Sequence, residues 1–186
     1  MSKAVAVVVL AEGFEEIEAV TPIDVLRRAG AEVTVAGLED GPVLGSRGVR
    51  IVPDTPLADV ASVEYDLVVL PGGMPGATNL RKDPRVVEIV RRTLAANRTV
   101  GAICAAPAVI LDSCGVLAGR RATCHPALAD RMVEGELTNE RVTVDGNVIT
   151  SMGPGTAMEF ALALVSALYG DAKAEEVNAP MFARLA

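Results

Sequence analysis

The chain has 186 residues, a length that fits one compact domain with a core of its own. Apolar residues make up 51% of it, but aromatic residues only 3%, so the stacking surfaces of single-stranded nucleic-acid binders are missing. The formal net charge of −7 argues against a phosphate-backbone partner and favours an ordinary soluble protein.

The first predicted element is the apolar run AVAVVVL at residues 4–10. This run is too short to span a bilayer, acidic residues soon follow it, and it shows no signal-peptide cleavage pattern. We therefore expect a cytoplasmic protein that does not associate with membranes. The run is continuous rather than alternating, as is LVVL at residues 67–70, which indicates parallel strands buried on both faces.

Between the strands, the sequence predicts helices with clear boundaries. A helix over residues 15–29 contains Pro22, where we expect a kink, and Gly30 can end it. Asp83 and Pro84 can open a second helix as cap and first-turn proline. The apolar side of that helix is predicted to consist of Val86, Val87, Val90 and Leu94.

The remaining segments predict hairpins and a final helix. Residues 44–52 indicate a short ribbon, and residues 141–151 indicate a hairpin with Asp145-Gly146 at its turn. Thr156 and Glu159 have the spacing of a capping box ahead of FALALVSALY, a helix that Gly170 can end. With no repeat or linker in view, residues 1–186 predict one doubly wound α/β domain with a mostly parallel sheet.

In such a sheet, ligands bind beyond the carboxyl ends of the strands. Three loops start from predicted strand ends, namely residues 11–14, residues 71–76 (PGGMPG) and the turn at Cys104. The glycine-rich loop is neither a Walker nor a Rossmann motif, because GxxxxGK[ST] and GxGxxG are both absent from it. These loops are therefore candidates for a catalytic site rather than a nucleotide site.

Cys104 lies between a short apolar strand and a segment that can form a helix, in the run TVGAICAAP. Unpaired N–H groups and the dipole at a helix start stabilise a thiolate, so we expect a lowered pKa and a nucleophilic cysteine. The alternative is a small buried apolar residue. Cys114 and Cys124 form no CxxC pair with it or with each other, which argues against a structural zinc site and a disulfide framework.

Two further groups of residues can assist this cysteine. The N–H groups of Gly72, Gly73 and Ala105 can form an oxyanion hole, although the glycines can equally form a simple strand-exit turn. Glu15, Glu16 and Glu18 lie at a helix start, where the dipole alone favours acids. Whichever of Glu15 and Glu18 faces the crevice is expected to be a partly buried carboxyl with a raised pKa that shuttles a proton.

His125, the single histidine, can be structural or can assist the cysteine in catalysis.

The chain resembles the ThiJ/PfpI superfamily in several motifs. They are the CHP motif that contains His125 and the runs LAEGFEEIEAVTPIDVLRRAG, LPGGMPGA, AICAAP and SMGPGTAMEFALALV. Within that superfamily, the chain resembles the branch of the human Parkinson disease protein, which contains protein deglycases and glutathione-independent glyoxalases. The resemblance covers nearly the whole chain, with its motifs in family order.

The resemblance implies a flavodoxin-like three-layer α/β/α sandwich and a homodimer. It implies a nucleophile at Cys104, a protonated partner at Glu18 and a nearby imidazole at His125. It also implies a pocket around the thiol whose members are Gly72, Gly73, Ala105, Arg47 and Pro154. The protease branch carries a histidine directly after its cysteine, and because that position is Ala105 here, peptidase activity is not expected.

On this basis we expect a cofactor-free enzyme that binds no metal and converts methylglyoxal or glyoxal to lactate or glycolate. The same chemistry on glycated protein side chains would make it a deglycase. The competing hypothesis is an oxidative-stress sensor or redox-regulated chaperone in which Cys104 becomes a sulfinate bonded to Glu18. A small-molecule amidotransferase relative is a third possibility, but the chain lacks the expected partners of the cysteine and a synthetase domain.

Overall fold

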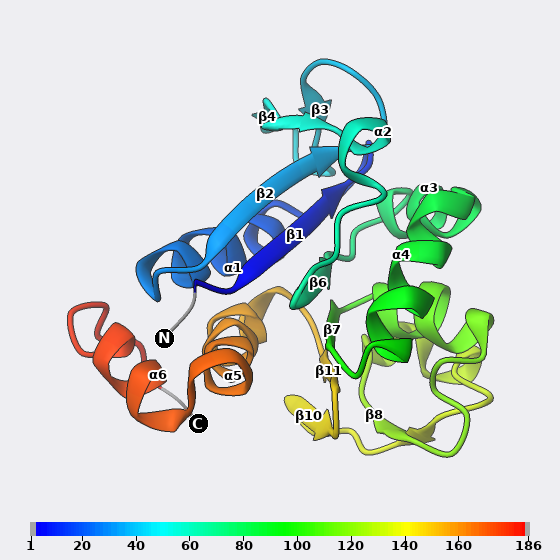
Figure 1. Ribbon diagram of the computed structural model, residues 1–186. Helices are drawn as coiled ribbons and strands as arrows, with labels where there is room; N and C mark the ends of the chain where they lie inside the picture. The colour runs from blue at the N-terminus through cyan, green and yellow to red at the C-terminus, as the bar shows by residue number, and fades with distance from the viewer. Residues whose placement is uncertain (1–2, 185–186) are drawn as a thin grey trace.

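The structure is a computed structural model that describes residues 3–184, and its centre is a seven-stranded sheet (Figure 1). The strand order is β10-β11-β7-β6-β1-β2-β5, and every neighbouring pair is parallel except the β10-β11 hairpin. The strands are β1 (Val5–Leu10), β2 (Glu32–Gly37), β5 (Thr55–Pro56), β6 (Leu67–Leu70), β7 (Thr99–Ile103), β10 (Val142–Asp145) and β11 (Val148–Ser151).

Helices cover both faces of this sheet, so the fold is the predicted α/β sandwich. On one face, α1 (Glu16–Arg28) packs against α5 (Ala157–Tyr169), with α6 (Asp171–Asn178) beside α5. The other face carries α2 (Leu57–Val60), α3 (Gly76–Lys82), α4 (Pro84–Ala95) and a helical segment over residues 107–114. In the described part of the chain, no helix is both long and apolar enough to cross a membrane.

The continuous apolar run of β1 serves two cores at once. Val7 and Val9 pack with the α3/α4 layer, whereas Ala6, Val8 and Leu10 pack with the α1/α5 layer. Successive side chains of a strand point to opposite faces, so a strand covered on both sides needs apolar residues at every position. The prediction of buried parallel strands is therefore confirmed, with the first strand beginning at Val5 rather than at residue 4 and the second covering residues 67–70.

Most predicted helix boundaries are confirmed. Glu15 is the N-cap of α1, Pro22 lies inside that helix, and Gly170, with φ of 87°, ends α5. Asp83 caps α4 by accepting a 2.9 Å hydrogen bond from the Arg85 N–H. The buried side of α4 differs from the prediction, because Val87 and Leu94 are only half-buried; its buried residues are Val86, Ile89, Val90 and Thr93.

The predicted Thr156–Glu159 capping box is wrong. The Thr156 hydroxyl pairs with Ser151 Oγ at 2.6 Å and accepts the Gly153 N–H, so it is not available to α5. The Glu159 carboxylate instead binds Arg141 through both oxygens. Tertiary partners thus compete successfully with a local cap that the spacing alone favours.

Both predicted hairpins are present. The 44–52 ribbon consists of β3 (Val43–Leu44) and β4 (Arg50–Ile51), paired antiparallel. In the β10-β11 hairpin, Asp145 pairs with Val148, so the turn residues are Gly146 and Asn147, one position later than predicted. Two further short strands, β8 (Arg121–Ala122) and β9 (Glu136–Leu137), pair parallel to each other. Short 3-10 helices cover Pro126–Arg131 and Pro154–Thr156.

Candidate active site

Three loops meet at one edge of the sheet because the strands they follow are neighbours. β7, β6 and β1 lie side by side, and after them come Cys104, the loop 71–76 and the loop 11–14. All three strands are parallel, so their carboxyl ends are at the same edge. This arrangement confirms that the three loops singled out in the sequence share one region of the molecule.

Cys104 occupies a sharp turn between β7 and the helical segment that follows. Its φ of 64° is in the left-handed region, which a residue with a side chain adopts only when its surroundings hold it there. The Cys104 N–H donates to the Ser151 carbonyl at 2.8 Å, and its carbonyl accepts the His125 N–H at 2.8 Å. Backbone bonds on both sides thus fix a half-buried thiol on a strained strand-to-helix turn, the usual setting of an enzymatic nucleophile.

The following helix differs from an ordinary α-helix. Residues 107–111 form a π-helix and residues 112–114 a 3-10 turn, so the helical segment changes its hydrogen-bond spacing. Cys114 lies at its end and is half-buried. Cys124 is buried, and burial together with the nearby Asp112 charge raises the pKa of its thiol to about 11. All three cysteines are free thiols.

Glu18 extends from α1 toward Cys104 and is completely buried. Its Oε2 accepts the Gly72 N–H at 2.8 Å, while Oε1 has no hydrogen-bond partner among the side and main chains of residues 3–184. Burial raises the pKa of the Glu18 carboxyl to about 7, against the opposing hydrogen bond of Cys104. The negative charge of Glu15 adds to the rise. A carboxyl of this kind can hold or release a proton near neutral pH.

The expectation that the helix start lowers the Cys104 pKa is wrong in direction. Burial raises the pKa of this thiol most, and the charge of Glu18 and its hydrogen bond raise it further. Hydrogen bonds from the N–H groups of Gly73 and Ala105 act the other way and favour the thiolate. Because a protonated Glu18 has no charge and can donate to sulfur, the thiolate is favoured when Glu18 holds the proton.

Gly72 and Gly73 of the 71–76 loop lie so close to neighbouring segments that a side chain would not fit at either position. A Cβ at Gly72 would lie 2.8 Å from both the Cys104 Cβ and the Ala105 nitrogen. Gly73 has φ of 85°, and a Cβ there would lie 2.5 Å from the Gly13 carbonyl oxygen. The prediction that Gly72 offers an oxyanion donor is wrong, because its N–H already binds Glu18. The N–H groups of Gly73 and Ala105 do face the sulfur.

The three acids of the first α1 turn have three different partners. Glu15 caps the helix by accepting the Glu18 N–H at 2.9 Å, and Glu18 faces the thiol. Glu16 accepts hydrogen bonds from the β3-β4 ribbon, at 2.7 Å from the Arg47 N–H. Sequence reasoning assigned Glu16 only to the helix dipole; its adjacency to Glu15 and Glu18 in the run FEEIE gave no sign of the ribbon that it binds.

His125 reaches the site through its backbone more than through its ring. Its Nδ1 accepts the Ala127 N–H at 3.2 Å, so Nε2 is the ring nitrogen that can take part in proton transfer. Ring atom Cδ2 lies 3.6 Å from the Cβ position of Gly153, so the imidazole faces the loop in which Pro154 follows. No hydrogen bond between this ring and the thiol is present in the described part of the chain.

Arg47 is exposed on the ribbon, held through its N–H by Glu16. Among the described residues, no cluster of three or more His, Cys, Asp or Glu side chains could hold a metal ion.

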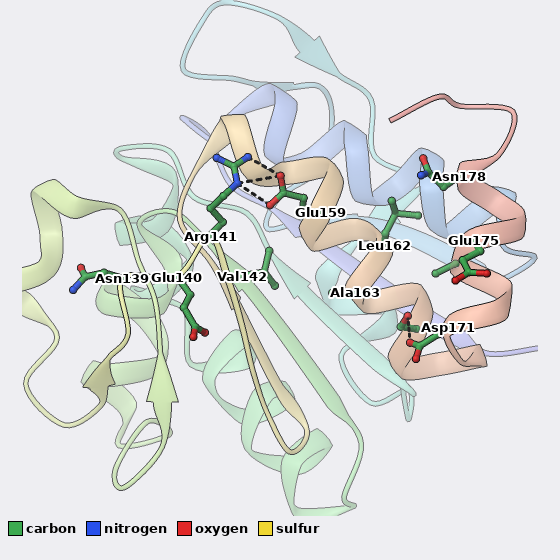
Figure 2. A pocket seen from close by; sticks show the side chains of 12 residues that line it. Asn139, Glu140, Arg141, Val142, Glu159, Leu162, Ala163, Asp171, Glu175 and Asn178 are labelled. Atoms are coloured by element: carbon green, nitrogen blue, oxygen red, sulfur yellow. Dashed lines mark hydrogen bonds and ion pairs between the residues drawn. The ribbon is translucent and has the colours of Figure 1, made fainter. Parts of the chain in front are cut away.

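A separate cavity lies away from the Cys104 turn. It has a volume of about 760 Å³ and lies between β10, α5 and α6, with the Arg141–Glu159 pair near one end and Asp171 near the other (Figure 2). Neither Cys104, Glu18 nor His125 lines it. The nucleophile, the buried acid and the converging N–H groups therefore make the Cys104 turn, and not this cavity, the candidate active site.

Known proteins are similar to this chain in sequence. Residues 3–167 match the DJ-1/PfpI family. The Parkinson disease protein 7 homolog of Danio rerio is 46% identical over 181 residues, covering 95% of each chain. Glutathione-independent glyoxalase DJR-1.2 of Caenorhabditis elegans is 39% identical over 96% of each. The chain spans only 43% of the length of protein DJ-1 homolog A of Arabidopsis thaliana, with 44% identity.

Solved protein structures are also similar to this chain, in fold as well as in sequence. Drosophila melanogaster DJ-1beta superimposes with a TM-score of 0.94 at 44% identity, covering the whole of both chains. Oxidized Toxoplasma gondii DJ-1 superimposes with a TM-score of 0.95 at 38% identity, covering 98% of this chain and all of the other. The sequence match over residues 3–167 and the full-length structural likeness lead to one conclusion: the chain belongs to the DJ-1/PfpI family.

Proposed function

We propose that the protein is a glutathione-independent glyoxalase that uses Cys104 as its nucleophile and needs no cofactor. The observation that carries the proposal is the buried Glu18 carboxyl, with a pKa of about 7, set against the thiol. General acid–base catalysis is most efficient when the catalytic pKa lies near the working pH. The name of the Caenorhabditis elegans relative supports the same reaction class.

In the first step, the Cys104 thiolate adds to the aldehyde carbon of methylglyoxal. A C–S bond forms, the carbonyl electron pair moves to oxygen, and the Gly73 and Ala105 N–H groups that already face the sulfur stabilise that oxyanion. Protonated Glu18 then gives its proton to the oxygen. The product is a hemithioacetal on Cys104, and Glu18 is left as a carboxylate.

In the second step, a proton moves between adjacent carbons. The Glu18 carboxylate, assisted by His125, takes the proton from the former aldehyde carbon and returns it to the neighbouring ketone carbon, while the hydroxyl proton passes from the oxygen of the first carbon to the oxygen of the second. The first carbon is oxidised to a thioester and the second is reduced to an alcohol, so no external oxidant or reductant is needed. Water then hydrolyses the thioester, which releases lactate and restores the thiol; glyoxal gives glycolate by the same steps.

The same site can act on early adducts of these dicarbonyls with protein side chains. If the dicarbonyl carbon is transferred from a Cys, Lys or Arg side chain to the Cys104 sulfur, the side chain leaves with the thiol proton. The hemithioacetal that remains is the one already described. The protein would then be a deglycase of the cytoplasm as well as a glyoxalase.

We also propose that the protein is a homodimer. Ile17, Val20, Val49 and Val52 leave 47–73% of their surface exposed although all four are large and apolar. The ribbon that carries Val49 is hydrogen-bonded to the start of the helix that carries Ile17 and Val20. We call these four residues the α1-ribbon face. A second copy of the chain would remove this face from water.

A redox role for the same cysteine is the second candidate. The two N–H groups and the Glu18 carboxyl that face the sulfur could equally bind the oxygens of a Cys104 sulfinate, and a close structural relative is described as oxidized. In that case the reduced protein would not turn over dicarbonyls.

The test is turnover of methylglyoxal by fully reduced protein, with chelator present and glutathione absent, and with the product identified by NMR. We expect steady formation of lactate by the wild type and only the uncatalysed rate with Cys104→Ser. Cys114→Ser, which changes a half-buried thiol at the end of the helical segment, is the matched control and should keep the wild-type rate. Full activity of Cys104→Ser would overturn the mechanism, and a reduced wild type without turnover would favour the redox role.

A further inference from the structure

We propose that Glu16 is a positioning residue for Cys104, because it holds the β3-β4 ribbon that fixes the Gly73 N–H against the sulfur. The proposal deepens the proposed function and rests on it for its catalytic meaning. The contacts that carry it run from the carboxylate to the sulfur in three steps.

The first step is from Glu16 to the ribbon. Its Oε1 accepts the N–H groups of Arg47 at 2.7 Å and Val49 at 3.3 Å, and its Oε2 accepts the Ser46 hydroxyl at 3.3 Å. Burial would raise the pKa of this carboxyl, but the hydrogen bonds hold it below its ordinary value. A Cβ at Gly45 would lie 2.8 Å from the Glu16 Cγ, so the glycine leaves room for the side chain.

The second step is from the ribbon to the loop after β1. The Gly13 N–H donates to the Leu44 carbonyl at 2.8 Å, and the Ser46 N–H donates to the Phe14 carbonyl at 2.7 Å. The ribbon segment on either side of Gly45 is thus bonded to two successive residues of the loop. Glu16 binds Arg47 and Val49 of the same ribbon. Because it holds the ribbon in place, it also holds the loop of residues 11–14.

The third step is from that loop to the donor at the sulfur. A Cβ at Gly73 would lie 2.5 Å from the Gly13 carbonyl oxygen and 2.6 Å from the Phe14 carbonyl carbon, so these backbones are in direct contact. The Glu15 N–H also donates to the Gly72 carbonyl at 3.1 Å. The Gly73 N–H then bonds the Cys104 sulfur and favours its thiolate.

Two acids of one helix turn therefore act on the same cysteine from different sides. Glu18 touches the thiol and exchanges the proton, whereas Glu16 touches neither thiol nor substrate and keeps a thiolate-stabilising donor in register. Hydrogen bonds to charged groups are strong, so displacement of the Gly73 N–H donor would destabilise the Cys104 thiolate.

The experiment measures the pH dependence of Cys104 alkylation by iodoacetamide, with peptide mass mapping to separate it from Cys114 and Cys124. We expect Glu16→Ala to move the midpoint upward by about 1 unit, because it weakens one hydrogen bond to a charged group. Glu16→Gln keeps a carbonyl oxygen for the Arg47 N–H and should recover at least half of the shift. Asp83→Ala removes the remote α4 cap and serves as the control for a general loss of stability.

An unchanged midpoint in Glu16→Ala would overturn the inference, as would an equal shift in Asp83→Ala. If Glu16→Ala does not fold, amide hydrogen exchange in Glu16→Gln decides: faster exchange at Gly73 than in the wild type supports the inference, and an unchanged rate overturns it. The alkylation readout needs no turnover. A wild type that makes no lactate would therefore remove the proposed function and leave this inference intact.

Discussion

Glu18 is the residue at which stability and reactivity oppose each other most clearly. Its carboxyl is completely buried, its pKa is raised from 4.5 to about 7, and its negative form is costly to hold in the folded protein. Between those two pH values, the folded chain binds more protons at this site than the unfolded chain. The free energy of unfolding therefore falls as pH rises through this range, and the loss is complete above pH 7.

The fall in the free energy of unfolding with rising pH can be tested by a substitution at Glu18. Glu18→Gln cannot ionise and keeps an oxygen for the Gly72 N–H, so it should be more stable than the wild type at pH 8, by roughly 3 kcal/mol at most. The advantage should shrink toward zero at pH 4. Urea unfolding at both pH values checks this, with the exposed Glu12→Gln as control. A Glu18→Gln variant less stable than the wild type at pH 8 would show that the buried carboxyl is not penalised.

The sequence predicted which residues lie together at the candidate site better than what each one contacts. Cys104 could be chosen from its position at a strand end, whereas the helix start left both Glu15 and Glu18 open, and only the family resemblance indicated Glu18. The direction of the Cys104 pKa shift could not be predicted, because it depends on burial and on the distance to Glu18. The use of the Gly72 N–H by Glu18, and of Glu16 by the ribbon, depends on contacts across 54 and 31 positions of the chain.

Among the elements, the packing of α5 on β7 explains a glycine in the middle of a buried strand. A Cβ at Gly101 would lie 2.7 Å from Leu164 Cδ2 and 3.0 Å from Phe160 Cζ. Gly101→Ala therefore forces the completely buried Leu164 and Phe160 side chains to move, and we expect it to lower the free energy of unfolding by about 1–3 kcal/mol. Calorimetry or urea unfolding measures this loss.

Gly155→Ala is the matched control for that prediction. No atom lies within 4 Å of the position that its Cβ would take, so its stability should stay within about 0.5 kcal/mol of the wild type. Equal stability of Gly101→Ala and the wild type would mean that the Leu164 and Phe160 side chains can move at no cost.

Element types could be predicted from periodicity, but details that depend on tertiary partners could not. Continuous apolar runs correctly indicated strands covered on both faces, and Asp83-Pro84 correctly marked the start of α4. The capping box failed because Ser151 and Arg141 bind the two side chains that would have formed it. The π-helix after Cys104 has no signal in the composition of PAVIL.

For the whole molecule, the α1-ribbon face predicts a dimer that charge can disrupt. Sedimentation equilibrium should give the wild type roughly twice the mass of the 19.2 kDa chain. Val20→Glu combined with Val52→Glu should give the monomer mass, because two buried charges would oppose each other across the symmetric contact. Val133→Glu, at a site 77% exposed outside this face, should remain dimeric. A monomeric wild type would contradict the proposed dimer.

The doubly wound sheet also explains why the candidate site could be predicted from the sequence while the cavity beside α5 could not. Carboxyl ends of parallel strands converge by topology, so the loops after β1, β6 and β7 had to meet. The cavity between β10, α5 and α6 depends on how a hairpin and two helices are spaced, which no local pattern specifies.

The rate of lactate formation from methylglyoxal by Glu18→Gln tests whether the Glu18 carboxyl transfers the proton. The variant keeps a polar group beside Cys104 but loses the transferable proton, so kcat should fall by about 10²–10⁴-fold while a substrate analogue binds with wild-type affinity. Turnover by Glu18→Gln at the wild-type rate would show that the buried carboxyl does not carry the proton between the two carbons.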